Sequence, residues 1–178
     1  MSESVVTTRS MAFDVLHDVV LVVHADCPPD DGDWDAFLDR VRGLGLAQRY
    51  TSLVLCEGPG PNAGQRKRMM ALPGLSDART VVLTTSLVAR GTVTALNWLG
   101  YRKLRALDYA DLTGGLDYLR VPRAHHLDIA ARVVALKHGL LGVPPSDAMS
   151  TDQTLTLAVL TLAQLTHALP PRGDTSAA

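Results

Sequence analysis

The segment from residue 51 to residue 71 constrains the fold of this chain more than any other part of the sequence. It opens with a short apolar run, residues 53–56, which has the length and composition of a buried strand. A tight turn of alternating glycine and proline follows at residues 58–61, and the pattern then predicts a helix that begins after Asn62. This helix N-terminus would lie at the carboxyl end of the strand, where open α/β sheets bind ligands and partners.

Short apolar runs alternate with helical patterns over most of the chain. We expect strands at residues 11–15, 19–25, 53–56, 79–85 and 103–107, and helices at residues 34–42, 62–70, 87–99 and 111–119. Strands that alternate with helices predict a largely parallel sheet with right-handed crossovers. The expected fold class is therefore α/β, with a mixed, mostly parallel sheet of about four to five strands in a domain at residues 11–122.

The chain after residue 122 has a different pattern, which predicts a helical extension at residues 123–169. Its two helices are expected at residues 124–141 and 151–169. The second helix is almost uncharged, so it has to be buried against something. We expect it to cover the sheet or to form a homodimer interface through one apolar stripe that contains Leu155, Leu162, Leu165 and Leu169. The polar ends, residues 1–10 and 170–178, are expected to be flexible.

Charge and composition argue against several classes of partner. The net charge is -1 and aromatic residues make up 4% of the chain, which argues against binding to nucleic acid. No apolar run approaches the roughly 18–20 residues that span a bilayer, and the N-terminus lacks the regions of a signal peptide. Cys27 and Cys56 have no metal spacing and suggest free thiols in a reducing compartment, with a disulfide as the less favoured alternative. We therefore expect a cytoplasmic protein without a membrane partner.

Three glycines near the predicted turn invite comparison with a phosphate-binding loop. Gly58, Gly60 and Gly64 are close in sequence, but no Lys-Ser/Thr pair follows them. The prolines between them also remove backbone donors that a phosphate would need. A tight turn capped by Asn62 is the favoured interpretation, and no cofactor is expected.

The histidines give no sign of a catalytic or metal centre. His24 lies near Asp26 and Cys27 at the end of a predicted strand, but further ligands and partners for a nucleophile are missing. His125 and His126 are adjacent, so they would point to different sides of a helix and could not easily share an ion. We therefore expect no catalytic residue, no metal site and no enzyme activity.

The two tryptophans are expected in opposite environments. Trp34 falls in the first turn of a predicted helix and is expected to be half exposed. Trp98 falls near the end of a largely apolar helix and is expected in the core.

The order of the elements resembles the STAS fold, the fold of anti-sigma-factor antagonists. The likeness covers roughly residues 11–120: one or two strands, a helix, and then three strand–helix steps centred on residues 51–71. In typical members a D-S-S-G-like motif starts the helix after a strand, and a partner kinase phosphorylates a serine there. Here Pro61, Asn62, Ala63 and Gly64 occupy that place, and Gly64 matches the motif's glycine. The phosphoacceptor position is Ala63, which has no hydroxyl group, so a phosphorylation switch is not expected at that position.

The resemblance implies a bacterial regulatory or scaffold domain that acts by protein–protein interaction and self-associates. Its expected partner surface lies at the edge where the second and third helices begin, and comprises Asn62, Gly64, Gln65, Arg66, Ser86 and Arg90. The alternative is a small-molecule or nucleotide-binding α/β domain that holds an anion at the helix N-terminus beside Asn62.

Overall fold

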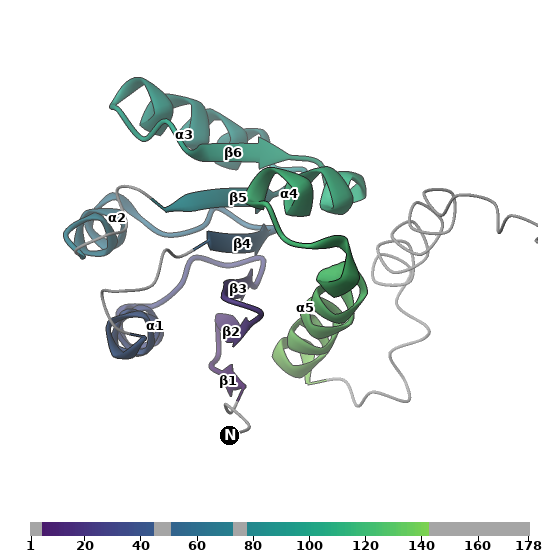
Figure 1. Ribbon diagram of the computed structural model, residues 1–178. Helices are drawn as coiled ribbons and strands as arrows, with labels where there is room; N and C mark the ends of the chain where they lie inside the picture. Colours follow the sequence, from purple (N-terminus) through teal and green to yellow (C-terminus); the bar gives the residue numbers. More distant parts are fainter. Residues whose placement is uncertain (1–4, 45–50, 73–77, 143–178) are drawn as a thin grey trace, which may run out of the picture.

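A six-stranded sheet forms the centre of the molecule in the computed structural model, which describes residues 5–44, 51–72 and 78–142 (Figure 1). Its strands lie side by side in chain order: β1 (Val6–Thr7), β2 (Met11–Leu16), β3 (Val19–His24), β4 (Thr51–Cys56), β5 (Arg79–Leu83) and β6 (Leu104–Leu107). Strands β3 to β6 are parallel, whereas β1 and β2 are antiparallel to their neighbours. The mixed, mostly parallel α/β fold is confirmed. The sheet gains a sixth strand because Val6–Thr7 pairs with β2.

The helices form one layer on each face of the sheet (Figure 1). Each step from β3 to β6 moves to the next strand in the same direction, so right-handed crossovers place the three connecting helices on one face. These helices are α1 (Asp31–Gly43), α2 (Ala63–Met70) and α3 (Leu87–Trp98). The opposite face carries α4 (Leu112–Leu119) and α5 (His126–Leu141), which follow the short turns η2 (Tyr109–Asp111) and η3 (Arg123–His125).

The face under α4 and α5 is closely packed. Leu53, Leu55, Val81 and Leu83 of the two central strands have almost no exposed surface. The expected helix at residues 124–141 is confirmed as α5, whose buried residues join the same apolar cluster as those of α4. The second expected helix, with Leu155, Leu162, Leu165 and Leu169, lies outside the described residues.

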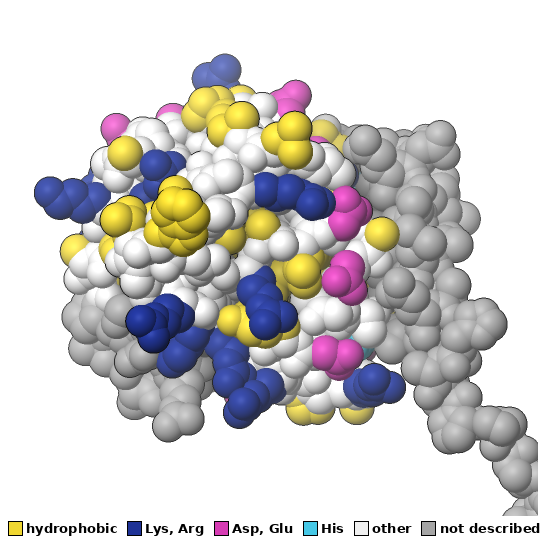
Figure 2. Space-filling view, turned by 90° about the horizontal axis from the view of Figure 1, so that it is seen from above, with side chains coloured by type: hydrophobic (Ala, Val, Ile, Leu, Met, Phe, Trp, Pro, Cys, Tyr) yellow, Lys and Arg dark blue, Asp and Glu magenta, His cyan; other side chains and the backbone are white. Residues whose placement is uncertain are grey.

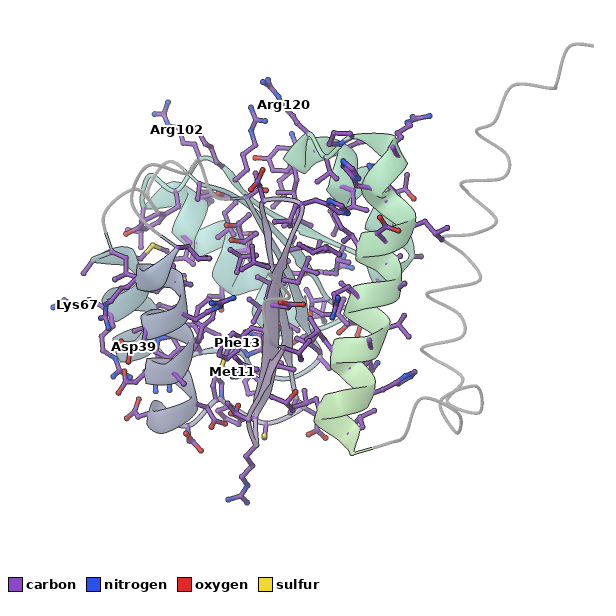
Figure 3. All side chains as sticks on the ribbon, turned by 60° about the horizontal axis from the view of Figure 1, so that its bottom comes forward. Met11, Phe13, Asp39, Lys67, Arg102 and Arg120 are labelled. Atoms are coloured by element: carbon purple, nitrogen blue, oxygen red, sulfur yellow. The ribbon has the colours of Figure 1, made fainter. Side chains whose placement is uncertain are left out.

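The face under α1 has its own apolar cluster, centred on aromatic side chains. Figure 3 shows Met11 and Phe13 of β2 on the side of the sheet that carries α1. There Phe13 meets Phe37 edge to face, with ring centroids 5.5 Å apart, and Trp34 packs against Phe37 at 5.3 Å. Asp39 and Lys67 point away from this layer into solvent (Figure 3). Residues of the strand hairpin and of α1 thus bury one half of this face.

Both expectations for the tryptophans were wrong. Trp34 is 2% exposed, because the first turn of α1 faces the sheet, and its indole N–H donates a hydrogen bond to the carbonyl oxygen of Gln65 at 3.0 Å. Trp98 is 88% exposed. Helix α3 packs on β6, which is the edge strand, so among the described residues no further element covers its outer side. Within the same residues, no helix combines the length and the apolar character that a membrane crossing requires.

Candidate functional site

The β4–α2 connection is held by a reciprocal capping interaction. The Asn62 side chain accepts a hydrogen bond from the Gln65 backbone N–H, and the Gln65 side chain accepts one from the Asn62 N–H, both at 2.9 Å. The expected cap at Asn62 is confirmed. Gln65 is fully buried and its amide donates to the carbonyl oxygen of Pro29 at 2.8 Å, so it also ties α2 to the start of α1. Gly64 is exposed at the same helix N-terminus.

The remaining residues of the expected partner surface also bond within the protein. The Arg66 guanidinium donates to the carbonyl oxygen of Pro61. Ser86 caps α3 through the N–H of Ala89 at 3.3 Å. Arg90 donates to the carbonyl oxygen of Thr84 and pairs with Asp108 at 3.0 Å. The six expected residues therefore lie at the carboxyl-end edge of the sheet as the topology predicts, and their polar groups stabilise the turns there.

The turn after β4 passes very close to the chain that leaves β3. A Cβ atom on Gly58 would lie 2.5 Å from the carbonyl oxygen of Asp26, and backbone cannot move aside as a flexible side chain can. We expect Gly58→Ala to lower the free energy of unfolding by about 1–3 kcal/mol in urea titrations.

Gly43→Ala is the matched control for this substitution. A Cβ at residue 43 meets nothing within 4 Å, and the residue is helical, so its stability should be unchanged or higher by up to about 1 kcal/mol. Equal losses in the two variants would contradict the close approach at Gly58.

A cavity of about 150 Å³ lies between the sheet and the two helices α2 and α3. We call it the sheet cavity. Val54 and Val82 lie at its base, Met69 and Met70 of α2 form one side, and Ala89 and Val93 of α3 form the other. Val54 and Val82 are register partners on the two central strands, yet both are only partly buried, whereas Leu55 and Val81 beside them are fully buried on the opposite face.

The sequence of α2 explains why this half of the sheet is incompletely covered. The helix reads AGQRKRMM, so it offers only two large apolar side chains, and it packs mainly against α1. Helix α3 contributes Ala89, Thr92 and Val93 to the same space, with Leu96 as the largest of its side chains there. Amphipathic helices ordinarily cover a strand face of this kind completely, whereas here the sheet cavity remains between the helices and the strands.

His24 and Cys56 are adjacent across β3 and β4 and line the carboxyl end of the sheet cavity. Burial lowers the pKa of His24 to about 4, and burial, reinforced by the Glu57 carboxylate, raises the pKa of the Cys56 thiol to about 11. Both side chains are thus neutral near pH 7. They do not form the thiolate–imidazolium pair of a cysteine nucleophile. Cys27, whose thiol lies near His24 and Asp26 in the sequence, is exposed.

A second histidine cluster lies on the other side of the molecule. His17, in the β2–β3 turn, approaches Asp128 of α5 with 3.1 Å between its Nε2 and the carboxylate, and its ring stacks on His125 with centroids 3.8 Å apart. Stacked rings keep their nitrogen lone pairs in nearly parallel planes, so a shared metal ion would require one ring to turn. His126 is buried away from this cluster, with Nε2 3.0 Å from the carbonyl oxygen of Val121.

The outer side of α3 forms an exposed, uncharged surface. It comprises Leu87, Val88, Gly91, Thr94, Ala95, Trp98 and Leu99, which recur at helical spacing, and we call it the α3 face. Large apolar side chains mark its two ends, with Leu87 84% exposed at one end and Trp98 at the other. Figure 2 looks down on α3 and β6 and shows hydrophobic side chains standing out among lysines and arginines. The sequence contained this signal as a largely apolar helix, and only the expectation that Trp98 lies in the core was wrong.

Comparison with protein-family models, with curated proteins and with solved structures gave no match to this chain.

Proposed function

We propose that this chain is a non-enzymatic, STAS-like regulatory or scaffold domain of the bacterial cytoplasm that acts by protein–protein interaction, with the α3 face as its binding surface. The observation that carries the proposal is the exposure of Trp98, Leu87 and their apolar neighbours on one uncharged helix face. Exposed apolar patches of this kind mark interaction sites, and tryptophan is enriched among the residues that contribute most to binding. The antiparallel hairpin followed by strand–helix steps supports the STAS-like part of the proposal.

The occupant that we propose for the α3 face is the apolar segment 151–169 of a second copy of this chain. That segment carries one acidic residue, Asp152, and no lysine or arginine, so it matches an uncharged surface. Its stripe with Leu155, Leu162 and Leu165 needs an apolar surface to cover it, as the α3 face does.

The length of chain after α5 favours a second copy over the chain's own α3. Helix α5 ends beside β1, since a Cβ on Gly139 would lie 3.4 Å from the hydroxyl of Thr7. Helix α3 lies at the other edge of the sheet and on its other face. Five strand spacings make about 24 Å across the sheet, and two helix layers add about 20 Å through it. Residues 143–150 extend at most about 29 Å and would have to pass around the sheet, so docking within one chain is disfavoured.

The proposal predicts that Trp98→Gln and Leu162→Gln each weaken a homodimer. Size-exclusion chromatography with multi-angle light scattering, at several protein concentrations, should show a dimer for the unaltered chain. A loss of about 2 kcal/mol in all, summed over the two equivalent contacts of the dimer, should raise the dimer dissociation constant roughly 30-fold. Because the two side chains are proposed to share one interface, the effects should be less than additive in the double variant.

Lys67→Gln is the matched control, because Lys67 is exposed on α2 and lies outside the α3 face. It should leave the dimer unchanged. A chain that stays monomeric at every concentration, or a dimer that Trp98→Gln leaves intact, would contradict the proposal.

A further inference from the structure

We propose that the sheet cavity binds a small, neutral, mainly apolar molecule with one hydrogen-bonding group, such as a hydroxyl or a carbonyl. The site differs from the α3 face, because the cavity is lined by the inner residues of α3 and the α3 face consists of the outer ones. The proposal therefore does not depend on self-association.

The size of the sheet cavity fits a ligand of about one aromatic ring. Its volume of about 150 Å³ equals that of an engineered apolar protein cavity that stays dry and binds benzene. Well-packed domains leave few voids of that size. A cavity of this kind over the two central strands is a candidate binding site because most ligand sites are concave and mainly apolar.

The lining of the cavity favours an apolar ligand. Covering the half-buried side chains of Val54 and Val82 would remove apolar surface from water, which is favourable. Met69 and Met70 have flexible thioether side chains that can adapt to the shape of a ligand.

A buried polar side chain at the carboxyl end of the cavity indicates that the ligand has a hydrogen-bonding group. His24 is 4% exposed, and its Nδ1 has no hydrogen-bond partner among the described residues. Buried polar atoms in native proteins nearly always have a partner, and a ligand hydroxyl or carbonyl could supply one. The neighbouring ring of Trp34, with its centroid 6.2 Å from that of His24, offers an apolar surface to the same end of the cavity.

The charge state of the cavity favours a neutral ligand over an anion. His24 and Cys56 are both uncharged near pH 7, because burial lowers the pKa of the imidazole and raises that of the thiol. Two cations also line the cavity, and both already interact within the protein: Arg66 donates to the carbonyl oxygen of Pro61, and Lys103, just before β6, is not free either. An ionised ligand group placed beside His24 and Cys56 would lose its hydration, and neither of these neutral side chains would offer a counterion in return.

Phenol, benzene and benzoate test these features separately in titrations of the full chain followed by methyl NMR. We expect phenol and benzene to shift the methyl signals of Val54 and Val82. The signals of Val81 and Leu83, which lie on the opposite face of β5, should stay in place. Phenol should bind roughly three- to tenfold more tightly than benzene if its hydroxyl pairs with His24. Benzoate should bind more weakly than either.

Three variants locate the site. Val82→Phe and Ala89→Leu should each fill the cavity and abolish the shifts at Val54, and the spectra themselves report whether the fold is kept. His24→Phe should keep benzene binding and remove the preference for phenol. Leu127→Phe, at an exposed position of α5, is the control and should bind as the unaltered chain does.

The absence of shifts at Val54 and Val82 with both phenol and benzene, up to their solubility limits, would overturn the proposal. Binding that survives both Val82→Phe and Ala89→Leu would also overturn it. Equal affinities for phenol and benzene in the unaltered chain would overturn the role assigned to His24.

Discussion

Trp34→Ala is expected to lower the free energy of unfolding by about 3–5 kcal/mol, the range measured when a large buried aromatic side chain is truncated. Trp34 lies between the sheet and α1, touches Phe37, and donates its indole N–H to the carbonyl oxygen of Gln65. Its removal would enlarge the sheet cavity and leave that buried carbonyl without this donor. Trp34→Phe keeps most of the packing, so its loss should be smaller.

Trp98→Ala is the matched control for this large effect. The side chain is exposed, and surface substitutions usually change stability by about 0.5 kcal/mol or less. Urea unfolding should be measured at the lowest practicable protein concentration, because a dimer that buries Trp98 would add concentration-dependent stability. Similar losses for Trp34→Ala and Trp98→Ala would mean that the two tryptophans are buried to a similar degree, against the structure.

The contrast between these tryptophans shows what the sequence can determine. Apolar periodicity predicted both of their helices, α1 and α3, because that signal acts within a few residues. The same periodicity marks an apolar side of a helix without saying whether another element covers it. Helix α3 lies over β6, the edge strand of the sheet, so its outer apolar side, which includes Trp98, faces solvent instead of the core.

The sheet cavity could be anticipated only in part. Two signals were present: α2 has just two large apolar residues, and Ser52 and Thr80 place hydroxyl groups on the strand face beneath it. A void of about 150 Å³, however, depends on how far each helix stands from the sheet, which no local pattern specifies. Likewise His17 and Asp128 are 111 residues apart, and only the fold brings them together.

Acidification is expected to destabilise the protein through His24. Burial lowers its pKa from 6.5 to about 4 in the folded state, and no carboxylate contributes to that shift. Above pH 6.5 the imidazole is neutral in both states, so it does not affect the unfolding equilibrium. Between pH 6.5 and about 4 the unfolded chain binds a proton that the folded chain does not, so the free energy of unfolding falls as the pH falls. The full shift corresponds to a loss of about 3 kcal/mol.

The difference in unfolding free energy between the unaltered chain and His24→Phe isolates this effect, because acid effects shared by both chains cancel. His138, whose pKa is also lowered, by burial and then by Lys137, is present in both and drops out in the same way. The unaltered chain should lose stability relative to His24→Phe as the pH is lowered from 6.5 to about 4, and the difference should level off below that range. A difference that stays constant across these pH values would mean that His24 takes up its proton equally well in the folded and unfolded states. His24 would then not be desolvated at the end of the sheet cavity, and the preference for a neutral ligand would lose its electrostatic support.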